Sequence, residues 1–266
     1  MTAPGPVRVV IFTGGAELQP DVLDFVRRID RHGDIDLVGV FCQARERGFA
    51  GIVSDLWARR GFLAVPLLLQ RWMGMAVSVL SDPARATARR WTALNITDRL
   101  HFVPDLHDPH TLARLRDLAP DLGLVYGGPI IREELFGLPR LGTLGIHHGL
   151  APEYRGKKTT FWAIYHGERY VGVTIQRIGS RLDGGDVVAQ GRIPVGRAPL
   201  PVISARLVRL GLDLYMQAIL AVRDGTAKFV PQAQGTGILC HDPAITDVLR
   251  FWWRYLARLA KPATHD

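Results

Sequence analysis

The chain alternates short apolar runs with amphipathic segments from its first residues. Residues 7–13 (VRVVIFT) are almost all apolar or β-branched, which is typical of a buried strand. Residues 20–32 have apolar side chains three and four apart, which predicts a helix, and Gly33 is suited to end it. Residues 35–42 predict a second buried strand. A strand, a helix and a strand in this order predict a parallel βαβ unit.

The same alternation resumes near residue 109 and continues to residue 222. The predicted helices are 109–119, 130–136, 160–166 and 202–222, and the predicted strands are 122–126, 142–146, 172–178 and 186–193. We therefore expect an α/β fold of the Rossmann-like kind, with a mainly parallel sheet flanked by helices. One main domain is expected over residues 1–225.

Two further segments do not follow this pattern. Residues 44–90 form a predicted helical insert, with arginine-rich flanks around an apolar stretch at 62–80. Pro66, Gln70 and Arg71 lie near the middle of that stretch. Arginine at the centre of a bilayer costs about 2.5–3.5 kcal/mol, so a buried or interfacial helix is favoured over a membrane span. Residues 226–266 form a predicted C-terminal extension.

Within this extension, residues 248–261 (VLRFWWRYLARLAK) predict an amphipathic basic helix. Arg250, Arg254 and Arg258 recur every four residues and form one basic stripe. The apolar side chains are Leu249, Trp252, Trp253, Leu256 and Leu259. Tryptophan with arginine is typical of helices that lie on anionic lipid. The same pattern suits a helix packed on its own domain or on a second copy, so peripheral membrane contact, a lipid-linked substrate and a homodimer all stay open.

Composition fits a folded domain and favours anionic partners. The 266 residues are 47% hydrophobic and carry 33 basic against 25 acidic side chains, a net charge of +8. These values exclude a disordered, collagen-like or coiled-coil protein. The positive charge favours phosphates, nucleotides, nucleic acid or an acidic membrane surface. No signal-peptide pattern precedes the first strand, and Cys42 and Cys240 are expected to be reduced thiols of a cytoplasmic protein.

Residues suited to catalysis cluster between positions 145 and 186. His147 and His148 follow a predicted buried strand, at the edge where open α/β sheets place their sites. Asp183 and Asp186 lie in a glycine-rich loop after another predicted strand. Histidine moves protons near neutral pH, and a carboxylate from a neighbouring loop would orient it. No activated serine or cysteine lies nearby and no cysteines have zinc-ligand spacing, so neither a covalent nucleophile nor a metal is expected.

These motifs, in this order, resemble the formyltransferases that use 10-formyltetrahydrofolate. The matching segments are GIH at 145–147, LAPEYRG at 150–156, GVT at 172–174 and DGGD at 183–186. The family includes methionyl-tRNA, glycinamide ribonucleotide and sugar N-formyltransferases. The resemblance is strong from about residue 120 to 194 and implies the Rossmann-like formyltransferase fold. It also implies transfer of a formyl group from 10-formyltetrahydrofolate to an amine.

By this resemblance His147 is the catalytic histidine and Asp183 is its partner, while the family's asparagine falls on Gly145. That asparagine donates a hydrogen bond to the oxyanion formed when an amine attacks the formyl carbon. Losing one such donor typically costs about 10²–10³ in rate. Three consequences stay open: another donor substitutes, Gly145 makes room for a larger substrate or a water, or the chemistry is lost. The candidate donors are Lys157, Lys158, Thr159 and His148. Because His147 and Asp183 remain, retained chemistry is favoured.

The resemblance also assigns binding residues. The folate pocket would be walled by Tyr126, Gly127, Gly128, Ile178, Gly179, Leu182 and Asp183. The acceptor would meet His148, Arg155, Lys157 and Lys158, although Arg155 is equally suited to anchor its own loop.

The acceptor itself is expected to be a small or anionic primary amine, such as an amino sugar or a specialised metabolite. The alternatives are a hydrolase of 10-formyltetrahydrofolate and a catalytically weak folate-binding protein. Methionyl-tRNA formyltransferases carry a C-terminal β-barrel for tRNA. The residues after Val222 are too few for that domain and predict helix, so a tRNA substrate is disfavoured.

Overall fold

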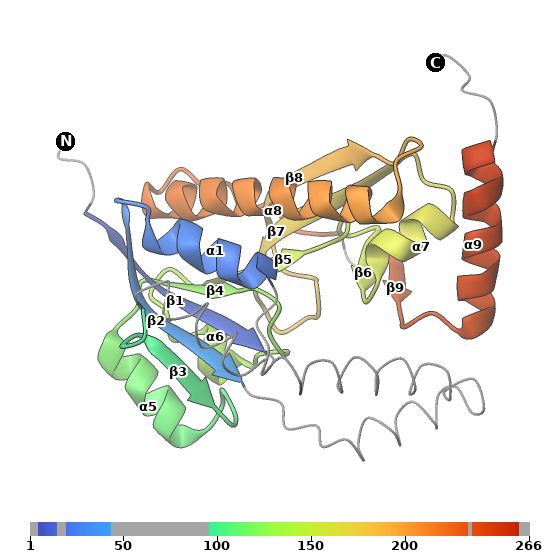
Figure 1. The fold of residues 1–266 in the computed structure, drawn as a ribbon. Coiled ribbons are helices and arrows are strands. Elements are labelled where there is room, and N and C mark those ends of the chain that lie inside the picture. The colour runs from blue at the N-terminus through green and yellow to red at the C-terminus, as the bar shows by residue number, and fades with distance from the viewer. Residues whose placement is uncertain (1–4, 15–19, 44–95, 234–235, 261–266) are drawn as a thin grey trace.

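The computed structural model describes residues 5–14, 20–43, 96–233 and 236–260 (Figure 1). The insert expected at 44–90 lies outside the described residues. The elements in chain order are β1 (Val7–Gly14), α1 (Pro20–Asp30), β2 (Ile35–Gln43), β3 (Leu100–Val103), α5 (Pro109–Leu118), β4 (Leu122–Val125), α6 (Glu133–Phe136), β5 (Thr143–His147), β6 (Tyr154–Gly156), α7 (Thr159–Tyr165), β7 (Tyr170–Arg177), β8 (Val187–Pro194), α8 (Leu200–Arg223), β9 (Ile238–Cys240) and α9 (Ile245–Ala260).

Seven of these strands form one sheet, in the order β3-β2-β1-β4-β5-β7-β8. The strands from β3 to β5 are parallel, whereas β7 pairs antiparallel with β5 and β8 pairs antiparallel with β7. Helices α1 and α8 lie side by side over one face of the sheet (Figure 1), and α5 and α6 pack on the other. The predicted α/β fold with a mainly parallel sheet is therefore confirmed.

The core is built by strict alternation along the central strands. Val9 and Ile11 of β1 belong to the cluster under α1 and α8, whereas Val10 and Phe12 belong to the cluster under α5 and α6. Successive side chains of a strand point to opposite faces, so one apolar run fills both layers.

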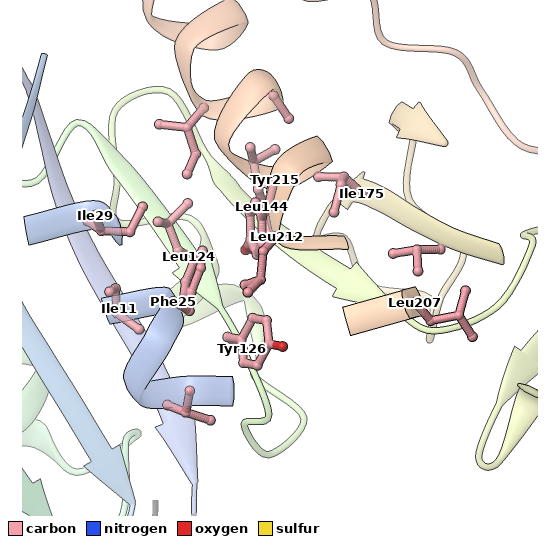
Figure 2. Packing of buried hydrophobic residues seen from close by; sticks show 14 of the residues in the cluster. Ile11, Phe25, Ile29, Leu124, Tyr126, Leu144, Ile175, Leu207, Leu212 and Tyr215 are labelled. Atoms are coloured by element: carbon pink, nitrogen blue, oxygen red, sulfur yellow. The ribbon is translucent and has the colours of Figure 1, made fainter. Parts of the chain in front are cut away.

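A column of aromatic rings fixes the strands that border the functional site. Phe25 of α1 stacks on both Tyr126 and Tyr215, with ring centroids 4.9 Å apart in each pair (Figure 2). The buried Tyr215 hydroxyl of α8 donates to the Leu144 carbonyl at 2.7 Å and accepts from the Val125 amide at 3.1 Å. Because a buried hydroxyl needs such partners, these bonds tie α8 to the end of β4 and to the neighbouring residue Leu144 of β5.

Three short strands were not anticipated from the sequence, and one predicted helix is shorter. Strand β3 extends the sheet beyond β2, and β6 pairs in parallel with β9, Tyr154 lying opposite Ile238 and Gly156 opposite Cys240. The C-terminal extension therefore contributes a strand as well as a helix. Helix α6 begins only at Glu133, so residues 130–132 of the predicted helix lie outside it. Cys42 and Cys240 are both buried and are not joined in a disulfide.

Helix α9 packs on α7, at the end of the molecule opposite β3 and α5 (Figure 1). The buried ring of Phe251 stacks on Phe161 with centroids 4.5 Å apart, and the Tyr255 hydroxyl donates to the Ala198 carbonyl at 2.7 Å. The Arg250 guanidinium donates to the Tyr165 hydroxyl at 3.2 Å. Among the helices that the structure describes, none is long and apolar enough to cross a membrane.

Candidate active site

A cleft of about 520 Å³ opens where β4 and β5 end. The turn after β4 forms one wall and the loop between β7 and β8 forms the opposite one. All seven residues expected to wall a folate pocket line this cleft: Tyr126, Gly127, Gly128, Ile178, Gly179, Leu182 and Asp183. The described residues contain no group of three or more side chains placed to hold a metal ion.

Glycine is required in the turn after β4. Gly127 has a φ of +62°, in the left-handed region that side chains disfavour. A Cβ on Gly128 would lie 3.2 Å from the Phe12 carbonyl oxygen. The turn therefore passes close to β1, and it offers the cleft backbone groups instead of side chains.

The predicted catalytic pair is brought together. His147, the last residue of β5, is buried, and its Nδ1 lies 3.4 Å from Oδ2 of Asp183. Its Nε2 lies 2.7 Å from the Tyr154 carbonyl oxygen, and Asp183 Oδ2 also accepts from the Gly156 amide at 2.8 Å. Both nitrogens of the imidazole therefore face acceptors, and both can donate only when each carries a hydrogen.

The two adjacent histidines differ in their access to the cleft. His148 lines the cleft, as does Asp183, whereas His147 does not. The half-buried imidazole of His148 forms no hydrogen bond with the described residues. Burial lowers the pKa of His148, the charge of His147 lowers it further, and Asp21 acts in the opposite direction. His148 is thus the imidazole that faces the cleft in its neutral form.

Gly145 lines the cleft and stands beside Ile178. A Cβ on Gly145 would clash with the Ile178 Cδ1, and the Ile178 amide donates to the Thr143 carbonyl at 2.7 Å. The end of the Ile178 side chain occupies the place that a Cβ at position 145 would take, while Gly145 itself lines the cleft. The expectation that Gly145 makes room for a larger substrate or a water therefore stays a prediction.

Two glutamines near the pair were missed by the sequence analysis. Gln176 of β7 lies directly opposite Gly145 of β5, and only 3% of it is exposed. Its Nε2 is 3.4 Å from Asp183 Oδ1, and its Oε1 accepts from Gln232 Nε2 at 2.9 Å. The available signal was the alternation in β7, where the buried polar residues Thr174 and Gln176 alternate with the apolar Val173 and Ile175.

The expected acceptor-binding cations lie away from this cleft. Arg155 is in β6, the Lys157 Nζ is 3.0 Å from Asp242 Oδ2, and Lys158 precedes α7 with a φ of +55°. Of these three only Lys157 lines a second cleft, of about 740 Å³, whose other wall is the C-terminal extension. Leu182 lines both clefts, so the two adjoin.

Comparison of the sequence with protein-family models matches residues 69–217, more than half of the chain, to the family described as formyl transferase. Curated relatives include a methionyl-tRNA formyltransferase of Roseiflexus sp. (strain RS-1), 34% identical over 186 residues, which are 64% of this chain and 57% of the relative. Another, from Koribacter versatilis, is 36% identical over 164 residues, 61% of this chain and 50% of the relative. The chain thus spans about half the length of these relatives.

Solved structures resemble the fold at low sequence identity. A phosphoribosylglycinamide formyltransferase from Anaplasma phagocytophilum has a TM-score of 0.60 at 16% identity, covering 88% of this chain and 97% of its own. A sugar N-formyltransferase from a Shewanella species has a TM-score of 0.56 at 14% identity, covering 92% and 86%. At such identities the likeness is one of fold.

Proposed function

Because the chain belongs to the formyl transferase family, we propose that it transfers a formyl group from 10-formyltetrahydrofolate to a primary amine of a small or anionic molecule. The observation that carries this proposal is the contact between Asp183 and His147 at the wall of a cleft of about 520 Å³. A buried imidazole against a carboxylate is an arrangement that holds and moves protons.

The walls of the cleft suit a folate-type donor. A pterin offers a row of hydrogen-bond donors and acceptors along one edge and flat apolar faces. The backbone groups of Gly127, Gly128 and Gly179 match the edge, and the side chains of Ile178 and Leu182 match the faces. The donor would be held by these groups with its formyl carbon toward Asp183.

The protons of the reaction would be handled by the two histidines. The amine nitrogen attacks the formyl carbon and must lose a proton, while the leaving folate nitrogen must gain one. His148, neutral and facing the cleft, would accept the proton from the amine. The unit of His147 and Asp183, which meets the cleft at the carboxylate, would supply the proton to the leaving nitrogen.

The second cleft is the proposed acceptor site. It adjoins the donor cleft at Leu182, and Lys157 on its wall is paired with Asp242. An anionic group on the acceptor would compete with Asp242 for the Lys157 ammonium. The net charge of +8 would draw an anionic acceptor towards this surface.

We also propose that α9 lies on an anionic lipid surface. Leu249, Trp252, Trp253 and Leu256 are exposed, and their spacing of three and four residues places them on one stripe of the helix. Arg250 and Arg254, both exposed, lie along one side of this stripe, where their guanidinium groups also donate to Tyr165 of α7. Exposed tryptophan with arginine beside it is typical of helices that lie on an anionic bilayer.

The function is tested by measuring release of tetrahydrofolate from 10-formyltetrahydrofolate, with and without a panel of amines, for the native chain and His147→Ala. Release that requires an amine and is lost in His147→Ala supports the transferase and identifies the acceptor class. Release without any amine would instead support the hydrolase. Binding without release would support a folate-binding protein.

A further inference from the structure

The pairing of β5 and β7 places a side-chain amide next to the glycine that replaces the family's asparagine. Gly145 lies opposite Gln176, and His147 lies opposite Thr174. Residues directly opposite in an antiparallel pair project to the same face, with Cβ atoms about 4.5–5.5 Å apart. The side chain of Gln176 therefore projects on the face of the sheet that carries His147, one strand away from Gly145.

The hydrogen bonds around Gln176 fix which end of its amide faces the cleft. Gln232 Nε2 donates to the Gly185 carbonyl at 2.6 Å, and a carbonyl can only accept, so this end of Gln232 is its NH₂ group. The same NH₂ group donates to Gln176 Oε1 at 2.9 Å. The Gln176 NH₂ group consequently points the other way, to within 3.4 Å of Asp183 Oδ1.

This NH₂ group has a hydrogen to spare. Asp183 Oδ1 accepts at most one of its two hydrogens, at a long distance of 3.4 Å. Gln176 and Asp183 both line the cleft. An amide that is 3% exposed and held at its oxygen end is preorganised to donate into that cleft.

The other donors expected from the sequence are less suited to bind the oxyanion than Gln176. Lys157 is paired with Asp242 on the wall of the second cleft, and Lys158 lines neither of the two clefts. The Thr159 hydroxyl donates to the His148 carbonyl. His148 does face the cleft, but as a neutral imidazole it is suited to accept the proton of the amine.

We propose that the side-chain amide of Gln176 donates the hydrogen bond that stabilises the oxyanion, in place of the family's asparagine, and that Gln232 is its positioning residue. The inference rests on the proposed formyl transfer. The amine forms a C–N bond to the formyl carbon, and the carbonyl electron pair moves to the oxygen that Gln176 binds. The pair then returns as the bond to the folate nitrogen breaks. That nitrogen gains one proton and the amine loses one, so the charge balances.

The direct test is Gln176→Leu, which keeps a similar volume and removes the amide. We expect kcat for amine-dependent release of tetrahydrofolate to fall by about 10²–10³. The Kd for tetrahydrofolate, which has no formyl oxygen, should stay within about twofold of the native value. The matched control is Gln217→Leu on the exposed side of α8, which should keep native activity. Native kcat in a folded Gln176→Leu protein would overturn the proposal.

A rescue variant separates loss of a donor from loss of structure. Adding Gly145→Asn together with Ile178→Ala to Gln176→Leu restores an amide at the family position and removes the side chain that blocks it. We expect this triple variant to be at least about tenfold faster than Gln176→Leu. A triple variant that binds tetrahydrofolate with native affinity but is no faster would argue against an amide at this place.

Gln232 is tested by reversing its hydrogen-bonding polarity. In Gln232→Glu the carboxylate cannot donate to Gln176 Oε1, so the Gln176 amide is free to turn its oxygen toward the cleft. We expect kcat to fall about tenfold or more with little change in KM for the folate. If KM for the folate changes by as much as kcat, or if kcat does not fall, Gln232 is not a positioning residue.

A binding readout applies even while the acceptor amine is unknown. In NMR spectra of the labelled full chain, the side-chain amide resonance of Gln176 is identified by its absence in Gln176→Leu. We expect 10-formyltetrahydrofolate, and not tetrahydrofolate, to shift this resonance while that of Gln217 stays in place. If the formyl donor binds and the Gln176 resonance does not move, the inference fails although the proposed function stands. If the donor does not bind at all, the proposed function fails with it.

Discussion

The cleft and the C-terminal helix α9 differ in how far their side chains are buried and paired within the domain. At the cleft, two buried polar side chains have partners inside the domain: His147 contacts Asp183 and the Tyr154 carbonyl, and Gln176 contacts Gln232. On α9 the buried ring of Phe251 stacks on Phe161, whereas 73% of Trp253, on the outer stripe of the helix, is exposed. The side chains proposed to carry the chemistry are therefore held by contacts inside the domain. The apolar side chains on the outer stripe of α9 are left exposed by the described residues.

Asp183→Asn should produce the largest effect on the cleft side of this comparison. The amide keeps the size of the carboxylate but cannot pair as an anion with His147 or take part in proton transfer. We expect kcat/KM for formyl transfer to fall by about 10²–10⁴. The control is Asp186→Asn in the same loop, which does not line the cleft. Equal losses in the two variants would contradict a specific role for Asp183.

Phe251→Ala should produce the largest effect on the α9 side. The ring is buried between Phe161 and Tyr255, so truncation leaves a cavity at the contact between α9 and α7. We expect the free energy of unfolding to fall by about 3–5 kcal/mol, measured in urea. Trp253→Ala, on the exposed stripe of the same helix, should change it by less than about 0.5 kcal/mol. Similar values for the two variants would show that α9 is not held by its inner face.

Local sequence patterns predict the longer helices and strands of the fold. The apolar runs of β1, β2, β4 and β5 and the periodicity of α1, α5 and α8 gave the layers of the fold. Strands β6 and β9 were not predicted, because each has only three residues and their pairing joins Tyr154 to Ile238, far apart along the chain. A local window contains no information on such a pair.

At the site, too, residues within motifs could be predicted and residues placed by tertiary packing could not. His147 and Asp183 stood in recognisable motifs, and the seven expected pocket residues all line the cleft. Gln232 belongs to no motif, and its contact with Gln176 depends on how the segment after α8 returns to the sheet. The difference between His147 and His148 in access to the cleft likewise follows from packing, since the two are neighbours in sequence.

Changes on the outer stripe of α9 should have an effect of intermediate size, on binding to lipid vesicles. If this stripe lies on lipid, the native chain should float with phosphatidylserine-rich vesicles at low salt and less at high salt, because salt screens the arginines. Replacing Trp252 and Trp253 by serine should weaken this binding about tenfold or more. Phe102→Ser, an exposed aromatic on β3, is the control and should bind as the native chain does. Native protein that stays unbound at low salt would remove the lipid proposal.

The smallest expected effect concerns the pH at which the cleft becomes active. Burial and the charge of His147 lower the pKa of His148, so its neutral form persists below the ordinary value of about 6.5. If this form accepts the amine's proton, kcat/KM should decline on the acid side only below that pH. Asp21 raises the pKa of His148, so Asp21→Asn should move the decline to lower pH by a fraction of a unit.

Profiles between about pH 5 and 8 decide whether this titration belongs to His148. In His148→Asn the decline should disappear and the remaining rate should be low, because no imidazole then faces the cleft. If the decline persists in His148→Asn, the titrating group is another residue. The proton of the amine would then pass to the buried pair of His147 and Asp183. For this, the hydrogen bond between His147 Nε2 and the Tyr154 carbonyl would have to break during the reaction.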